Sequence, residues 1–194
     1  MINVLSIDLD WLQSGYHLRD LNKIFFNKIK KTKKIIFSEH HHLIYNIIFD
    51  EKEISLCNID HHHDILYRDY HWENIATKNI VTASHWLGNL IYKKKITELN
   101  WYNNFNSQNI RDNYFGEKLL LENNVKFKIY QDLNNIKDFY DIVFICKSPT
   151  FLIPEFHSVF YVYLDYCLEN FKEKTIEASI TPNLHNSHLE GKND

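Results

Sequence analysis

Short runs of almost uninterrupted apolar residues recur along the chain, and polar residues follow each of them. The clearest runs lie at residues 3–7, 34–37, 54–59 and 141–146, and weaker ones lie at 99–102 and 125–130. Runs of this length with little polar alternation are typical of strands that are buried on both faces of a parallel sheet. We therefore expect a sheet made mainly of parallel strands.

Between these runs, apolar residues recur with the period of an α-helix. Leu18, Leu21 and Phe25 share one helical face, and residues 43–48 and 156–167 show the same spacing. Strands that alternate with helices predict an α/β fold of three layers, α/β/α, around the mainly parallel sheet. We expect one domain at residues 1–173, followed by a loose polar C-terminal tail at residues 174–194.

Composition and charge exclude several classes of protein. A net charge of −3 gives no reason to expect a nucleic-acid partner. The apolar runs are too short to span a membrane and no signal peptide is evident, so we expect a soluble, cytoplasmic protein without a membrane partner. Cys57, Cys146 and Cys167 are widely spaced in apolar surroundings, which predicts buried free thiols. The sequence leaves the oligomeric state open.

The first apolar run ends in two acidic residues. Asp8 and Asp10 are separated by one residue, so strand alternation directs both side chains to the same side. Taken alone, this pair favours a solvated strand end with a helix-capping aspartate over a metal site. At the carboxyl end of a parallel strand, where α/β proteins place their sites, the pair can also bind a cation.

A stronger pattern follows the run at residues 54–59. Asp60, His62 and Asp64 stand at alternate positions, which brings two carboxylates and one imidazole to one point. Mixed oxygen and nitrogen ligands suit Mn, Fe, Co or Zn, and the lack of neighbouring cysteines disfavours a structural zinc site. We expect the intervening His61 and His63 to face elsewhere.

A third cluster, Glu39 to His42, follows the run at residues 34–37. One histidine of this cluster is a candidate ligand; we assign His41, and His40 and His42 remain alternatives. Four or more carboxylates that converge on one place repel one another unless cations neutralise them. The three clusters together therefore predict a metal site.

These segments resemble the arginase and deacetylase superfamily, whose dinuclear members carry a D-x-H-x-D segment, an S-x-D-x-D segment and a further histidine near a strand end. Residues 60–64 match the first, residues 6–10 match the second, and residues 39–42 supply the third. The closer likeness is to a small arginase-like family that includes the peptide arginases of ribosomal peptide natural-product biosynthesis, with similar segments at residues 84–87 and 145–149. In ordinary arginases the two aspartate segments come in the opposite order, so the resemblance implies a rearranged strand order.

The resemblance implies two divalent metal ions, most simply Mn²⁺. Their ligands would be Asp8, Asp10, His41, Asp60, His62 and Asp64. It also implies hydrolysis of peptidyl-arginine to peptidyl-ornithine and urea, during maturation of an arginine-containing precursor peptide. Asp64 would be both ligand and proton acceptor, and either Glu39 or Glu155 would pair with the guanidinium group.

Other roles stay open at this stage. His85 and His71 are candidate proton carriers, although each lies next to a tryptophan and a packing role is an equal alternative. Ser148 either lines the pocket or belongs to a simple turn before Pro149. The alternative functions are a small-molecule amidinohydrolase, a deacetylase, or a non-catalytic metal-containing module that binds peptides. The short chain leaves little room for the loops that hold both ends of free arginine, which favours a peptide substrate.

Overall fold

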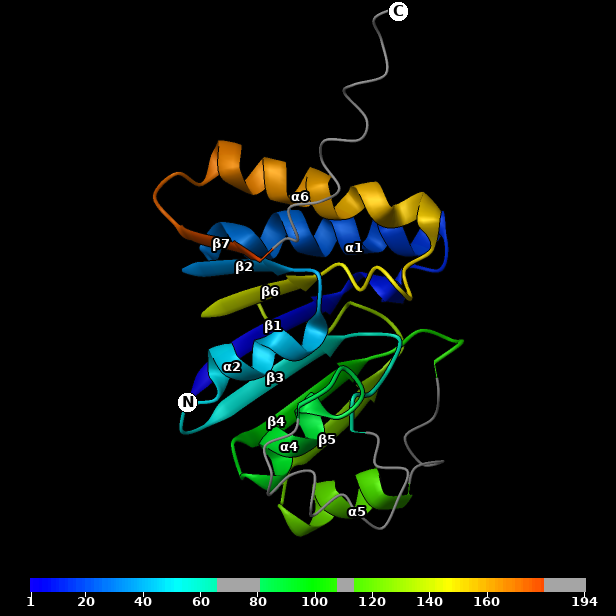
Figure 1. Cartoon of the computed structure of the whole chain (residues 1–194), viewed down its shortest axis with the longest axis vertical. Helices are drawn as coiled ribbons and strands as arrows, with labels where there is room; N and C mark the ends of the chain where they lie inside the picture. The colour runs from blue at the N-terminus through cyan, green and yellow to red at the C-terminus, as the bar shows by residue number, and fades with distance from the viewer. Residues whose placement is uncertain (66–80, 108–113, 180–194) are drawn as a thin grey trace, which may run out of the picture.

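The computed structural model describes residues 1–65, 81–107 and 114–179. Within these residues, seven strands form one sheet (Figure 1). In chain order they are β1 (Ile2–Asp8), β2 (Lys34–Ser38), β3 (Ile54–Ile59), β4 (Ile96–Tyr102), β5 (Lys126–Tyr130), β6 (Ile142–Cys146) and β7 (Thr175–Ser179). Their order across the sheet is β5-β4-β3-β1-β6-β2-β7, and every neighbouring pair is parallel.

Helices cover both faces of the sheet. They are α1 (Gly15–Lys28), α2 (Ile44–Ile48), α4 (Trp86–Tyr92), α5 (Tyr114–Glu122) and α6 (His157–Asn170), with the short 3₁₀ turns η1 (Leu9–Trp11), η2 (Ile29–Lys31), η3 (His41–Leu43) and η5 (Pro154–Phe156). One core contains residues of α1 and α6, and a second core contains residues of α2, α4 and α5. Leu5 of β1 belongs to the first core and Val4 to the second, because successive side chains of a strand point to opposite faces. The predicted three-layer α/β fold is confirmed.

Helices α1 and α6 lie side by side on one face (Figure 1). Helix α1 begins after Ser14, whose hydroxyl accepts a hydrogen bond from the backbone N–H of His17 and so caps the first turn. Phe25 of α1 stacks on Tyr163 of α6 with ring centroids 3.7 Å apart, and the Tyr163 hydroxyl donates to Asn22 Oδ1 at 2.7 Å. The contacts between Phe25, Asn22 and Tyr163 hold the two helices against each other.

The expected tail contains a strand. Residues of β7 pair in parallel with β2, and Lys34 Nζ lies 2.8 Å from a carboxylate oxygen of Glu177. An edge strand buries few side chains, so β7 carries no apolar run and the expectation of a loose segment from residue 174 was wrong for Thr175–Ser179. Residues 180–194 lie outside the described part of the chain.

Two other expectations concern the whole fold. Cys57, Cys146 and Cys167 are free and buried, as predicted. Among the described residues, no helix combines the length and the apolar character needed to cross a membrane.

Candidate metal centre

The acidic and histidine clusters meet at the carboxyl edge of the sheet. Strands β3, β1, β6 and β2 are consecutive neighbours, and each is followed directly by polar residues of the site. These residues surround a cavity of about 120 Å³. Its lining includes Asp8, Asp10, His41, His62, Asp64 and Ser148. Because the carboxyl ends of parallel strands face the same way, residues distant in sequence converge here.

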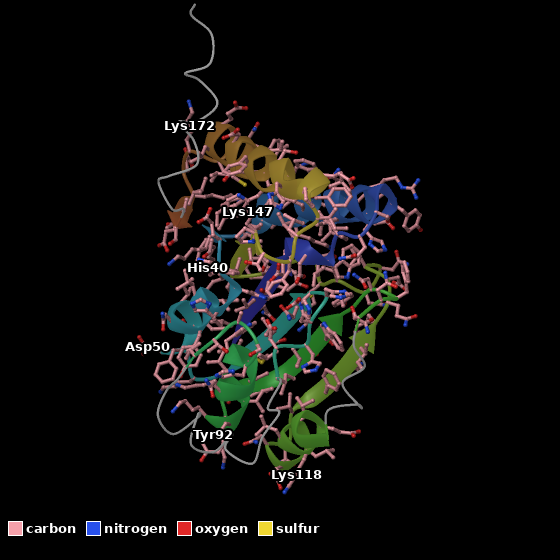
Figure 2. The ribbon with its side chains drawn as sticks, turned by 45° about the vertical axis from the view of Figure 1, so that its right-hand side comes forward. His40, Asp50, Tyr92, Lys118, Lys147 and Lys172 are labelled. Carbon is pink, nitrogen blue, oxygen red and sulfur yellow. The ribbon has the colours of Figure 1, made fainter. Side chains whose placement is uncertain are left out.

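His41 lies at the centre of a first group of ligand atoms. Its Nδ1 is 3.0 Å from Asp8 Oδ2, 3.2 Å from Asp60 Oδ2 and 3.1 Å from Asp64 Oδ2. The residue is 3% exposed, yet Nδ1 completes a hydrogen bond with none of these oxygens. His40, labelled in Figure 2, is exposed, so of these two histidines the structure brings His41 to the cluster.

A second group overlaps the first. His62 Nδ1 lies 2.9 Å from Asp10 Oδ2, and the backbone N–H of His62 donates to Asp60 Oδ1 at 2.8 Å. Ligand atoms of Asp10, Asp60 and His62 all lie within 4.8 Å of one another, and the same holds for Asp8, His41 and Asp60. Asp60 therefore belongs to both groups.

Burial makes the charge of this cluster costly. Burial, followed by the charges of Asp8 and Asp60, raises the pKa of Asp10 to about 7. Burial and the neighbouring Asp64 likewise raise the pKa of Asp60 to about 7. The hydrogen bond with Asp10 raises the pKa of His62 to about 9. Asp10 and Asp60 thus need positive charge beside them to stay ionised at neutral pH.

The distances around His41 fit a bound cation. Bonds from a metal ion to imidazole nitrogen or carboxylate oxygen measure about 2.0–2.2 Å, so neighbouring ligands of an octahedral ion lie about 2.8–3.1 Å apart. The three distances from His41 Nδ1, 3.0, 3.1 and 3.2 Å, are close to this value. A proton on Nδ1 can form a good hydrogen bond with only one of these oxygens. A cation placed between the nitrogen and the three oxygens could contact all four atoms. This buried set of aspartates and histidines could therefore hold a divalent metal ion.

Neutral hydrogen-bond donors hold the candidate ligands in place. The hydroxyl of Ser6 lies 2.6 Å from His41 Nε2. The donors to the carboxylates are Ser148 Oγ to Asp8, Asn58 Nδ2 to Asp60, and the Trp86 indole N–H to Asp64. Sequence reasoning missed the roles of Ser6 and Asn58, although each stands two residues before an aspartate on the same face of its strand. Polar residues at such positions within apolar strands are a usable signal.

The structure separates the remaining candidates. Glu39 is buried and lines a second, smaller cavity that shares His41 and Ser148 with the first. Glu155 is exposed on η5 and lines neither cavity, because the neighbouring Phe156 takes the core-facing position. The structure thus brings Glu39, and not Glu155, to the site.

Two further histidines lie close to the site. His85 Nδ1 lies 2.7 Å from Thr82 Oγ1 at the start of α4, and His85 is not among the residues that line the metal cavity. His63 does line the cavity, which corrects the expectation that it faces elsewhere. Its Nδ1 accepts a hydrogen bond from the backbone N–H of Ile65. His71 lies outside the described residues.

Two backbone positions at the cavity are unusual. Asp64 has a φ of 52° and Ser148 a φ of 45°, in the left-handed region that non-glycine residues seldom adopt. Such conformations persist where surrounding contacts impose them, and they concentrate at functional sites. Both residues line the cavity.

Comparisons with known proteins assign no family to this chain and no role to this site. No family model matches this chain, and no curated protein or solved structure matches it either. The described residues provide an α/β fold with a buried cluster of aspartates and histidines that could hold a metal ion.

Proposed function

We propose that this protein is a metal-dependent hydrolase that cleaves a guanidinium C–N bond of peptidyl-arginine, leaving peptidyl-ornithine and urea. The observation that carries the proposal is the overlap of two ligand groups at Asp60 beside an open cavity. A purely structural ion needs one closed set of ligands, whereas overlapping groups beside a cavity are what two ions and a substrate require.

In this proposal the two groups hold two ions, with Mn²⁺ as the metal. Asp8, His41, Asp60 and Asp64 provide the ligands of one site, and Asp10, Asp60 and His62 provide those of the other. When bound, two such ions acidify a water molecule and stabilise charge that develops at the reacting carbon. Mixed carboxylate and imidazole ligands agree with this choice of metal.

Asp64 is the proposed proton acceptor. Asp64 lines the cavity, so its carboxylate is within reach of a water molecule held there and can accept its proton. The Trp86 indole donates to Asp64 Oδ2 and holds the carboxylate in place. The reaction forms a C–O bond and breaks a C–N bond, and the proton that Asp64 takes from water is delivered to the departing δ-nitrogen of ornithine.

The cavity favours arginine within a peptide over free arginine. Among the described residues that line it there is no lysine or arginine to pair with the α-carboxylate of a free amino acid. Glu39, at the adjoining small cavity, is the proposed partner of the guanidinium. Phe151 is 58% exposed at the rim and offers an apolar contact for a peptide backbone.

Mass spectrometry of arginine-containing peptides tests this function. We expect Mn²⁺-loaded protein to produce a loss of about 42 Da at arginine, the difference between arginine and ornithine, together with one urea for each loss. Asp64→Asn should bind peptide but release no urea, and Asp50→Asn, at an exposed position, is the matched control. Urea release from free arginine with no change in any peptide would indicate a small-molecule amidinohydrolase. Metal and peptide binding without urea release from either substrate would indicate a binding module.

A further inference from the structure

Ser148 has a backbone conformation that a serine adopts only under constraint. Among the described residues, the non-glycine positions with positive φ are Asp64, Lys94, Asn124 and Ser148. Ser148 is followed by Pro149, which disfavours helical conformations in the preceding residue. The positive φ and the following proline therefore both oppose the conformation that this serine adopts.

Backbone hydrogen bonds on both sides of Ser148 impose this conformation. Its N–H donates to the carbonyl of Glu39 at 3.2 Å, and its carbonyl accepts from the N–H groups of Phe151 and Leu152 at 2.9 Å each. Glu39 follows β2, and Phe151 lies at the cavity rim. The turn after β6 is thus tied to the neighbouring strand and to the rim, which leaves the serine side chain directed at the floor of the site.

The result is a two-sided clamp on Asp8. Ser148 Oγ donates to Asp8 Oδ2 at 2.6 Å, and the backbone N–H of Asp10 donates to Asp8 Oδ1 at 3.1 Å. Asp8 Oδ2 is also the oxygen that lies 3.0 Å from His41 Nδ1. With both oxygens held, the Asp8 carboxylate cannot rotate away from the neighbouring ligand without losing a hydrogen bond.

We propose that Ser148 is a positioning residue of the metal centre, whose hydroxyl orients Asp8 toward His41 before a metal ion binds. The inference rests on the metal centre of the proposed function. A hydrogen-bond donor beside a metal ligand keeps the carboxylate from turning toward water. The ligand therefore loses less conformational entropy when the ion binds. Loss of such a partner typically weakens metal affinity by about 10- to 100-fold.

Ser148→Gly removes the hydroxyl and leaves the backbone conformation unchanged. Glycine adopts a φ of 45° without strain, so the variant keeps the turn and loses only the donor. We expect Mn²⁺ affinity, measured by calorimetry and by the electron paramagnetic resonance signal of free Mn²⁺, to fall by about 10- to 100-fold. The melting temperature of the metal-free variant should stay close to that of the wild type, because relief of the backbone strain is offset by loss of the hydrogen bond to the buried Asp8.

Lys94→Gly is the matched control. Lys94 also has a positive φ, of 56°, but it lies before β4 at the opposite edge of the sheet. This variant should show the same relief of strain with unchanged Mn²⁺ affinity. Ser148→Ala keeps Cβ and the backbone strain of the wild type but lacks the hydroxyl, so the folded variant should bind Mn²⁺ as weakly as Ser148→Gly.

Two results distinguish a failure of the positioning role from a failure of the metal centre. If wild-type protein binds Mn²⁺ and Ser148→Gly binds it equally well, or if folded Ser148→Ala binds as tightly as the wild type, the positioning role is overturned and the metal centre stands. If wild-type protein itself binds no Mn²⁺, the metal centre is overturned, and the role of Ser148 with it.

Discussion

Replacing Asp60 with asparagine should affect the metal-free and metal-loaded proteins in opposite directions. Asp60 is 1% exposed and belongs to both ligand groups. Asparagine has nearly the same shape but no charge. Without metal, the change removes a buried charge from a crowded set of carboxylates and should stabilise the fold. With metal, it removes the shared ligand and should abolish the stabilisation that the ions provide.

The pKa of Asp60 sets the size of the first effect. Burial and Asp64 raise this pKa from 3.8 to about 7, so the folded state is penalised at every pH above 3.8 and fully above about pH 7. At about 1.36 kcal/mol per pH unit, the penalty is about 4 kcal/mol. Asn58 and the His62 N–H both donate to Asp60, and the new amide cannot accept at both positions, which costs about 1 kcal/mol. The net gain of about 3 kcal/mol corresponds to a rise of about 6–12 °C in melting temperature.

Calorimetry at pH 8 measures both effects. In EDTA, Asp60→Asn should melt above the wild type. In Mn²⁺ at about a hundred times its dissociation constant, the wild type should gain about 2.7 kcal/mol for each ion that it binds and the variant nothing. Asp50→Asn, at the exposed position labelled in Figure 2, should change neither value. A lower melting temperature of Asp60→Asn in EDTA would refute the reasoning, because it would mean that the carboxylate stabilises the metal-free fold.

Three further predictions concern separate parts of the structure. His41→Ala should lose at least one equivalent of metal by elemental analysis, whereas His40→Ala should bind like the wild type. An unchanged metal content of His41→Ala would remove His41 from the site. Hydrogen bonds from Lys137 and Ser55 lower the pKa of Glu98 to about 2, so its contribution to stability is present above about pH 4.5 and is lost as the pH falls toward 2. Lys137→Met should flatten this part of the acid-unfolding curve, and an unchanged curve would contradict the assignment. Phe160 is fully buried in the core with α1 and α6, so Phe160→Ala should cost about 3–5 kcal/mol in urea unfolding, and a cost below about 1 kcal/mol would mean that the core is packed differently.

The sequence predicted the elements whose side chains are buried. The four clearest apolar runs became the inner strands β1, β2, β3 and β6, whose two faces are both covered by helices. Strand β7 was missed because it lies at the edge of the sheet and four of its five residues are exposed, so its pairing with β2 leaves no periodic pattern. Backbone pairing at an edge has little effect on side-chain composition.

The candidate ligands were predictable for a related reason. Asp8 and Asp60 stand where apolar strands end, and the parallel sheet brings those ends together. The contact between Trp86 and Asp64 depends on how α4 packs over the sheet, which no local pattern encodes. Glu155 was proposed from its residue type alone, and the exposed position of η5 could not be anticipated from spacing.

The position of β6 between β1 and β2 has a consequence for how the protein is made. His41, after β2, reaches Ser6 on β1 by lying across Phe144 of β6, with the two rings stacked at 5.9 Å. A growing polypeptide therefore carries His41 long before it can join the aspartates, since β6 emerges from the ribosome after all of them. Asp10, Asp60 and His62 follow the adjacent strands β1 and β3, so their group can form without β6. The group around His41 is complete only after this late strand has inserted, so during refolding a pulse of Mn²⁺ should bind to that group only as fast as β6 inserts.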